Sequence, residues 1–330
     1  MTSKSRDNTQ KQVHHVNVFT SDEDGCGGNL APIVLHAEGL TDEDMQGAAR
    51  KHGRESSFVT PKRREDEPGD DDGNVDFHLR FFVPEHEMEM CGHATVGTAW
   101  VMHELGVVGA NRMEITFMTK SGRVRTRRME RKGEDGQGRT TQVFVSQPAG
   151  TVADIVDQTM VEEILSVLGI SESQLQTTPR AVQNACTSRV KTAIALRDAA
   201  VVNALKPDFS RVRGLCERLG STGLYPYAIV QGKNNAAAAA AGGDRAGQHP
   251  VLEVEARQFP KASGYPEDAA TGIAAAALAY ALADNGVLRM GQEAVVHQGR
   301  AMGYQSRINV LLEEDGCWVG GTCAWDGRSG

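Results

Sequence analysis

The sequence predicts an α+β fold of two rolls related by an internal repeat, each a mostly antiparallel sheet around one central helix, with the active site in the cleft between them. Two observations predict this. Many short strands surround one strongly apolar helix in each half, unlike the regular strand–helix alternation of parallel α/β proteins. Residues 80–97 and residues 257–284 also share one order of strand, loop and helix. We therefore expect an N-terminal roll at 13–148 and a C-terminal roll at 149–330. The final strand can return to the N-terminal roll.

Length and composition agree with a globular enzyme-sized protein. The chain has 330 residues, 40% of them hydrophobic, and a formal net charge of −8 with no basic stripe, which argues against nucleic-acid binding. The polar start lacks the apolar core of a secretory signal, and no long apolar run is present, so we expect a soluble cytoplasmic protein without membrane contact. The six cysteines lack metal or disulfide spacing, so we expect reduced thiols and no metal site.

Each element expected in the first half follows from a local pattern. Thr41 can cap a helix that acidic residues open and that stops at Gly53. The segment 93–105 is apolar around its whole circumference, which indicates a buried helix. The basic residues at 123–128 alternate like a solvated edge strand. The expected strands are 13–19, 30–35, 55–59, 75–83, 113–118, 123–129 and 142–146, with a disordered start at Met1–Gln12 and a solvated loop at Lys62–Asn74.

The second half repeats this style. Helices are expected at 159–168, ending at Gly169, and at 207–219, beginning at a proline. A third helix at 271–284 is again apolar on all sides. The six-alanine run within Lys233–His249 is bordered by helix breakers, so we expect a surface insertion there. The expected strands are 190–196, 227–231, 251–259, 294–298, 307–312 and 318–324.

Both similar stretches place a titratable side chain at the start of a helix. These side chains are His93 and Asp268, and Glu55 begins a neighbouring strand. A helix N-terminus offers unpaired N–H groups and a partial positive charge, so it is a natural seat for a carboxylate. Gly92 and Gly272 let a ligand approach the backbone. We therefore expect two helix N-termini facing each other across one small-molecule site, with these three side chains as acid–base groups.

Each of the three side chains also has a simpler interpretation. Glu55 could be an exposed acid at a strand end, His93 a helix cap or a hydrogen-bonded core histidine, and Asp268 a helix cap. The repeat favours a shared site. Under the simpler interpretation, the equivalent positions of His93 and Asp268 at two helix starts would be a coincidence.

Five segments in a fixed order resemble the motifs of the PhzF-like isomerases of phenazine biosynthesis, which share the diaminopimelate-epimerase-like fold. The resemblance spans residues 13–324. The segments are Val16-Asn17-Val18-Phe19-Thr20 with Gly28-Asn29, Glu55-Ser56-Ser57-Phe58-Val59, Cys91-Gly92-His93-Ala94-Thr95, Glu267-Asp268-Ala269-Ala270-Thr271-Gly272, and Gln298-Gly299 with Met302-Gly303 and Ser306.

The resemblance implies a cofactor-independent isomerase of secondary metabolism, often a homodimer, that moves a proton between carbons of a small cyclic or amino-acid-like carboxylate. It makes Glu55 the proton shuttle, with His93 and Asp268 as supporting acid–base and binding groups. The substrate-binding residues that it implies are Asn29, Gly92, Ala94, Gly272 and Ile273.

Departures from the family pattern concern the substrate. Ile273 stands where the family often has serine, which suggests a more apolar substrate or a different one, and Tyr304-Gln305 and Leu30 replace other usual residues. A two-base epimerase or racemase is an alternative, because Cys91 lies at the first helix start and helix N-termini lower thiol pKa values. Its counterpart in the second stretch is Asp268, so a two-thiol mechanism is disfavoured. A non-catalytic metabolite binder is the remaining alternative.

Overall fold

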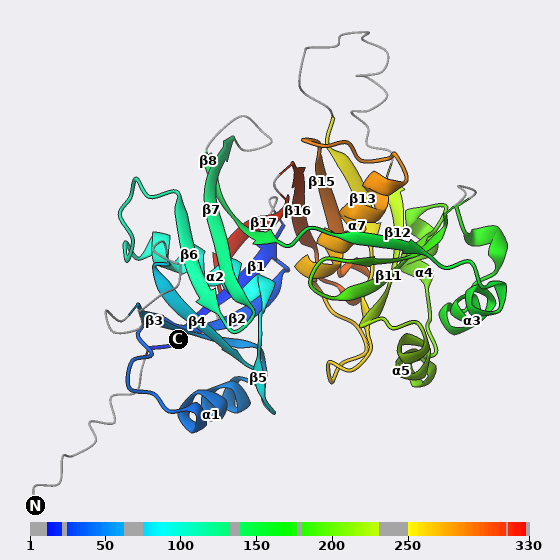
Figure 1. Ribbon diagram of the computed structural model, residues 1–330. Helices are drawn as coiled ribbons and strands as arrows, with labels where there is room; N and C mark the ends of the chain where they lie inside the picture. The colour runs from blue at the N-terminus through cyan, green and yellow to red at the C-terminus, as the bar shows by residue number, and fades with distance from the viewer. Residues whose placement is uncertain are drawn as a thin grey trace, which may run out of the picture.

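The computed structural model describes residues 12–21, 25–62, 75–132, 139–176, 180–230, 250–314 and 316–327. Figure 1 shows an α+β molecule with two bodies side by side, and a mixed sheet closes into a barrel in the first of them. The disordered start, the solvated loop at Lys62–Asn74 and the insertion at Lys233–His249 that the sequence predicts fall wholly or largely outside the described residues.

The first body is a closed ring of strands. They pair in the order β1, β2, β3, β4, β6, β7, β8, β17 and back to β1. The pairs β2–β3 and β4–β6 are parallel and the other pairs of the ring are antiparallel. The bounds are β1 His14–Thr20, β2 Asn29–Val34, β3 Ser56–Pro61, β4 Phe77–Phe82, β6 Glu114–Thr119, β7 Gly122–Lys132, β8 Arg139–Gln147 and β17 Gly316–Trp325, with the short β5 Glu87–Met88 beside β4.

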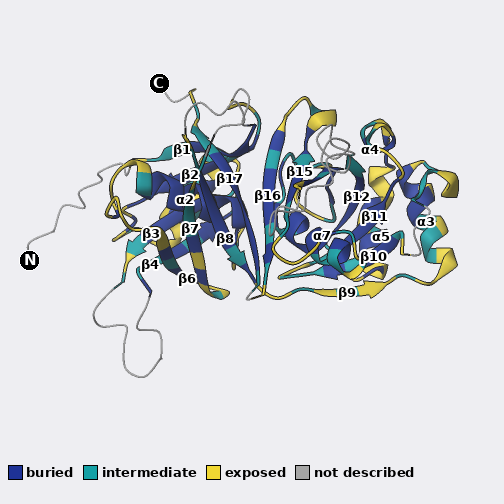
Figure 2. Cartoon of the chain, turned by 90° about the horizontal axis from the view of Figure 1, so that it is seen from above, coloured by how far each residue is buried: buried dark blue, intermediate teal, exposed yellow. Residues whose placement is uncertain are grey.

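Helix α2 (Gly92–Glu104) fills the barrel. It has no polar face, and the eleven residues from Gly92 to Met102 are all buried. Figure 2 shows this helix in dark blue inside the strands. A second helix, α1 (Asp42–His52), packs outside on β3 and β4, and the predicted Thr41 cap and left-handed Gly53 terminus are both present. Periodicity and capping residues therefore predicted both helices correctly.

The second body wraps a sheet around α7 (Gly272–Asp284). Strands pair in the order β9, β10, β11, β12, β13, β15, β16, β17, and β14 pairs with β12. Helix α7 is as apolar as α2 and contacts β9, β10, β11, β16 and β17. The bounds are β9 Thr151–Asp154, β10 Val182–Cys186, β11 Val190–Ala195, β12 Gly223–Val230, β13 Leu252–Ala256, β14 Phe259–Pro260, β15 Glu293–Gln298 and β16 Ser306–Glu313.

Three further helices cover the outer face of this sheet. They are α3 (Gln158–Leu168), α4 (Ala199–Ala204) and α5 (Phe209–Arg218), and together with the outward side chains of β11 and β12 they form a second hydrophobic core. The short 3-10 helices η1 (Glu172–Gln174) and η2 (Arg300–Met302) lie in connections. None of the helices within the described residues is long and apolar enough to cross a membrane.

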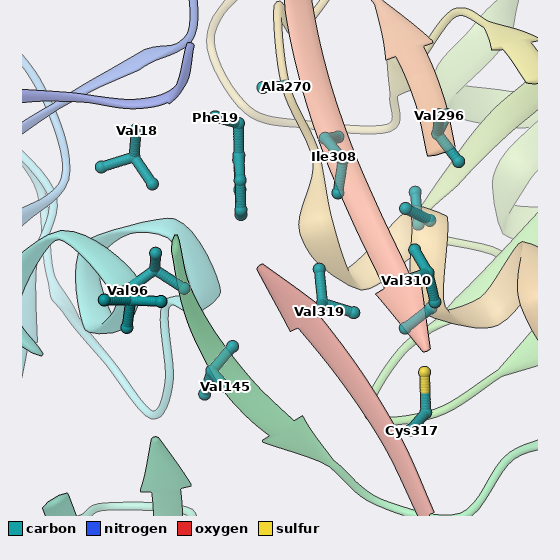
Figure 3. Packing of buried hydrophobic residues seen from close by; sticks show 14 of the residues in the cluster. Val18, Phe19, Val96, Val145, Ala270, Val296, Ile308, Val310, Cys317 and Val319 are labelled. Atoms are coloured by element: carbon teal, nitrogen blue, oxygen red, sulfur yellow. The ribbon is translucent and has the colours of Figure 1, made fainter. Parts of the chain in front are cut away.

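Strand β17 belongs to both bodies. Residues 317–322 pair with β8, residues 316–320 pair with β16, and residues 322–325 pair with β1. The core between the bodies is therefore continuous. In Figure 3 the ring of Phe19 stands between Val18 on one side and Ile308 on the other, and all three side chains are fully buried.

Phe19 reaches this place through a strained backbone. Its φ of 67° makes it the one non-glycine residue with positive φ among the described residues, and the β1–β17 register shifts between Val18 and Thr20. The bulge directs the ring against the start of α7, because a Cβ built on Gly272 would lie 3.3 Å from Phe19 Cζ.

The structure corrects one expectation and adds elements that were not expected. The basic strand β7 is not a solvated edge, because it pairs with β6 on one side and β8 on the other. Its Arg127 makes two hydrogen bonds with Glu313 and lies over the Trp318 ring. The elements β9, β10 and α4 were not expected, because they are short segments without a clear apolar period.

Candidate active site

A cavity of about 110 Å³ lies where the N-termini of α2 and α7 meet. A Cβ built on Gly92 would lie 3.9 Å from Ile273 Cγ1, so the two helix starts face each other closely. Asn29, Glu55 and Asp268 also border a larger groove of about 900 Å³, which widens the approach to the cavity.

The two helix starts at the cavity differ from those of the other α-helices described here. Side chains of Thr41, Asp157, Asp198 and Asp208 cap α1, α3, α4 and α5, whereas neither Cys91 before α2 nor Thr271 before α7 makes a side-chain cap. Neither helix carries an acidic residue in its first turn. The positive ends of both helices are therefore left to an anion from outside the chain.

His93 is the second residue of α2 and is 9% exposed. Its Nδ1 lies 3.5 Å from Cys91 Sγ, and its Nε2 is buried without a hydrogen-bond partner within the described residues. Burial alone would lower the pKa of His93, but the Cys91 side chain and the Glu55 and Asp268 carboxyls outweigh burial and raise the pKa to about 9. His93 is therefore a proton-bearing group whose outer nitrogen faces no protein acceptor.

Asp268 lies in the loop before α7 and is held by donors from three directions. Asn29 Nδ2 donates to its Oδ1 at 3.1 Å, Thr271 Oγ1 donates to its Oδ2 at 2.5 Å, and Gln298 Nε2 donates to its carbonyl oxygen at 2.8 Å. Burial raises the pKa of this carboxyl, and the Thr271 bond and the positive charges of His93 and Lys191 oppose the rise. Asp268 does not cap α7, since its side chain accepts from side chains and from no helix N–H.

Gln298 is itself held by a buried donor. Tyr225 is fully buried, and its hydroxyl donates to Gln298 Oε1 at 2.9 Å. Gln298 Nε2 donates to both Asp268 O and Thr271 Oγ1. This chain of hydrogen bonds runs from the main core, to which Tyr225 belongs, to the cavity and fixes the loop that carries Asp268.

Glu55 comes directly before β3 and is partly buried. Tyr265, in the loop after β14, donates its hydroxyl to Glu55 Oε1 at 3.5 Å, which is a long bond. The carboxylate thus lies at the junction of the cavity and the groove, from which it can reach a ligand.

Seven of the eight residues that the sequence analysis assigned to the site line this cavity, namely Asn29, Glu55, Gly92, His93, Asp268, Gly272 and Ile273. Ala94 does not, because its side chain is fully buried in the core. Within the described residues no group of three or more His, Cys, Asp or Glu side chains is arranged to hold a metal ion.

Further polar residues of the cavity were not expected from the sequence, and three of them are informative. Lys191, Gln258 and Tyr265 all line it. Lys191 is a single charged residue in an otherwise apolar strand, and Gln258 follows the arginine that begins the second repeated stretch, so both carried a signal. Tyr265 lies in a loop whose path only the structure shows.

Comparisons with known proteins identify similar chains. The family model described as phenazine biosynthesis-like protein (PhzC-PhzF) matches residues 16–321. An uncharacterized isomerase of Deinococcus radiodurans is 34% identical over 298 residues, covering 88% of this chain and 84% of that protein. The crystal structure of a PhzF-family phenazine biosynthesis protein of Bacillus anthracis has a TM-score of 0.76 at 24% identity, covering 95% of this chain and 96% of that one.

A hydroxyproline epimerase of Agrobacterium vitis, solved with bound trans-4-hydroxy-L-proline, shares the fold more distantly. Its TM-score is 0.53 at 10% identity, and the alignment covers 96% of this chain and 91% of the epimerase. This likeness concerns the fold alone.

Proposed function

Because the chain belongs to the phenazine biosynthesis-like (PhzC-PhzF) family of isomerases, we propose that it moves a proton between two carbons of a small, cyclic or amino-acid-like carboxylate by acid–base catalysis without a cofactor. The observation that supports this most directly is the convergence of Glu55, His93 and Asp268 on one cavity. These residues come from both halves of the chain, and two uncapped helix starts meet at the same place.

In this proposal the helix starts bind the substrate carboxylate. The backbone N–H groups at Gly92, Gly272 and Ile273 are the donors, as unpaired N–H groups at helix N-termini are in general. The role of the Ala94 N–H stays a prediction. Ile273 presents an apolar side chain to the substrate where the family often has a hydroxyl.

Glu55 then carries the proton. Its carboxylate removes a proton from one carbon, the electron pair shifts along the substrate, and the same carboxyl returns the proton to another carbon. Protonated His93, with its free Nε2, stabilises the negative charge that develops on the substrate, and Asp268 positions the reacting portion. No net proton is gained or lost.

An epimerase is the second candidate, and Cys91 is the observation that favours it. Its thiol lines the cavity 3.5 Å from His93 Nδ1, so this pair can exchange a proton on one face of a substrate carbon while an acid acts on the other face. Such an enzyme inverts one centre and leaves the substrate otherwise unchanged.

We further propose that the two halves are internal repeats with the site in the cleft between their rolls. In support, α2 and α7 have equal lengths and begin with glycine, and Arg80 and Arg257 each pair with a glutamate in the segment leading to the helix, Glu87 and Glu267. The homodimer, the cytoplasmic location and the role in secondary metabolism stay predictions.

Proton exchange with solvent tests the proposed activity. Candidate cyclic acids and α-amino acids are incubated with the enzyme in deuterated water, and NMR locates deuterium bound to carbon. We expect exchange with the wild type and none with Glu55→Gln. A label at a carbon away from the original C–H supports the isomerase, whereas a label at an inverted centre of unchanged constitution supports the epimerase.

A matched control is Glu162→Gln, which changes an exposed acid on α3. We expect this variant to exchange protons like the wild type. If acids bind the wild type and none of them exchanges a C–H proton, the protein is a metabolite binder and the proposal is wrong.

A further inference from the structure

The cavity contains a buried lysine for which the proposed proton transfer has no use. Lys191 lies on β11, is 7% exposed and lines the cavity. Within the described residues its ammonium makes no hydrogen bond or ion pair. An ammonium group taken out of water without a partner is costly, so such a group is kept when something outside the chain pairs with it.

The strand pattern puts Lys191 on the inner face of its sheet. Its strand neighbours at alternate positions, Ala193 and Ala195, belong to the core around α7, whereas Ile194 belongs to the core under the outer helices. Side chains alternate between faces along a strand, so Lys191 shares the face of the two alanines. This face contacts α7, and Lys191 extends it to the cavity.

A second polar side chain without a partner lies in the same cavity. Gln258 is 1% exposed, and both its Nε2 and its Oε1 lack hydrogen bonds within the described residues. A Cβ built on Gly223 would lie 2.1 Å from Gln258 Nε2, so the glycine leaves room for this amide. Buried amides are almost always hydrogen-bonded, so the unsatisfied donor and acceptor point to a ligand.

The charges around Lys191 favour an anionic ligand. Arg189, an exposed residue that also lines the cavity, is a second cation without an ion pair in the described part of the chain. Burial lowers the pKa of Lys191 to about 8, Arg189 adds to this, and the nearby Asp268 opposes it without contacting the ammonium. At neutral pH Lys191 thus remains cationic and unpaired.

We propose that Lys191, supported by Gln258 and Arg189, binds a second carboxylate of the substrate, so that the substrate class is a small dicarboxylate. This inference rests on the proposed function, in which the helix starts take the first carboxylate. Lys191 then provides the charged hydrogen bond and Gln258 Nε2 a neutral one, while Arg189 attracts the dianion to the cavity.

Paired probes test the second carboxylate by calorimetry. Malonate, succinate, glutarate and adipate are compared with propionate, butyrate, pentanoate and hexanoate, each diacid with the monoacid of equal length. A charged hydrogen bond is worth about 1.5–3 kcal/mol, so we expect at least one diacid to bind the wild type about 10- to 100-fold more tightly than its monoacid. Lys191→Met should remove this preference and keep the monoacid affinity, and Gln258→Leu should reduce it.

The melting temperature separates binding from a structural role. Lys191→Met removes an unpaired buried charge, so it should melt at or above the wild-type temperature, whereas loss of a structural lysine lowers it. Lys206→Met, at an exposed position outside the cavity, should change neither the melting temperature nor the preference for diacids. Equal binding of diacids and monoacids, no binding of any probe, or an equal loss for both classes in Lys191→Met overturns the inference. Solvent exchange with Glu55→Gln tests the proposed function separately, because these probes need not react.

Discussion

The side-chain amide of Asn29 donates a hydrogen bond to Asp268 Oδ1 at 3.1 Å, although the two residues are 239 positions apart in the chain. The same amide nitrogen donates to the carbonyl of Ala270 at 3.2 Å. Asn29 begins β2 in the barrel, and Asp268 precedes α7 in the second body. The Asn29 side chain thus links Asp268 of the second body to β2 of the barrel.

Replacing this amide should shift the titration of Asp268. In Asn29→Leu the buried carboxylate loses a donor that favours its ionised form, so its raised pKa rises further. If ionised Asp268 is needed, the acid limb of the pH–rate profile moves to higher pH, and the rate at low pH falls about 10- to 100-fold, as expected for a lost charge-assisted bond. The pH dependence of deuterium exchange measures this, and an unmoved acid limb would show that Asp268 is not titrating in turnover.

His93 should make stability depend on pH. Its pKa is about 9 in the folded protein against 6.5 for a free histidine, so the folded state holds the proton more tightly. This stabilisation is complete below about pH 6.5 and disappears as the pH rises through 9, with a size on the order of 3 kcal/mol. Urea unfolding of wild type and His93→Gln at intervals across this range should show a difference that shrinks with rising pH. A constant difference contradicts the raised pKa.

Lys191 should affect the pH dependence of stability in the opposite direction, because its charge destabilises the folded protein at neutral pH. Its folded pKa of about 8 lies below the free value of 10.5, so the unfolded chain holds the proton more tightly between these values. Lys191→Met should therefore be more stable than the wild type at pH 7, by about 3 kcal/mol, and the advantage should vanish as the pH rises from 8 to 10.5. Denaturant titrations at pH 7 and pH 10 check this, and a destabilised Lys191→Met at pH 7 would contradict it.

Alanine substitutions at Gly92 and Gly272 distinguish space that a ligand would occupy from space that the protein core fills. A Cβ on Gly92 meets nothing closer than 3.9 Å, whereas a Cβ on Gly272 lies 3.1 Å from Val319 Cγ1 and 3.3 Å from Phe19 Cζ. Gly92→Ala should leave the free energy of unfolding within about 1 kcal/mol and weaken carboxylate binding. Gly272→Ala should lose about 1–3 kcal/mol by overpacking. Unfolding and binding titrations on both variants test this, and full affinity in Gly92→Ala would place the carboxylate elsewhere.

Replacing Arg257 and replacing Arg80 should lower the free energy of unfolding by different amounts. Arg257 is buried with Glu267 and also donates to the carbonyls of Val202 and Leu205, so Arg257→Met should cost about 3–5 kcal/mol by stranding a buried carboxylate. Arg80 is half-exposed with its partners, and Arg80→Met should cost about 0–1 kcal/mol. Thermal and urea unfolding of both variants check the contrast, and similar losses would contradict it.

The sequence predicted the parts of the fold that depend on local pattern. The apolar helices α2 and α7 and the capped helix α1 lie close to their expected bounds, because hydrophobic periodicity and cap residues act within a few turns. The position of β7 inside the barrel depends on pairing with β6 and β8, which a charged alternating segment does not reveal. The short strands β9 and β10 likewise depend on their neighbours.

The candidate site was predictable where residues sit at the helix starts of the two similar stretches. His93 and Asp268 were found in this way, Glu55 was found from its place at the start of a strand and from the family resemblance, and the structure brings all three to one cavity. Tyr265 and the buried state of Lys191 depend on loop path and strand facing, which arise only when the two bodies pack. A lone lysine in an apolar strand is therefore worth treating as a candidate site residue.

Strand β17 has a consequence for how the protein is made. Its residues leave the ribosome long after those of β1 and β8, the two strands that it joins. Until residues 316–325 appear, both of those edges lack a partner, and unpaired edges are templates for misassembly. Domains usually fold in order of synthesis, but here the first barrel closes only after residues 316–325 have left the ribosome. Chaperone demand during synthesis should therefore fall on the half that is made first.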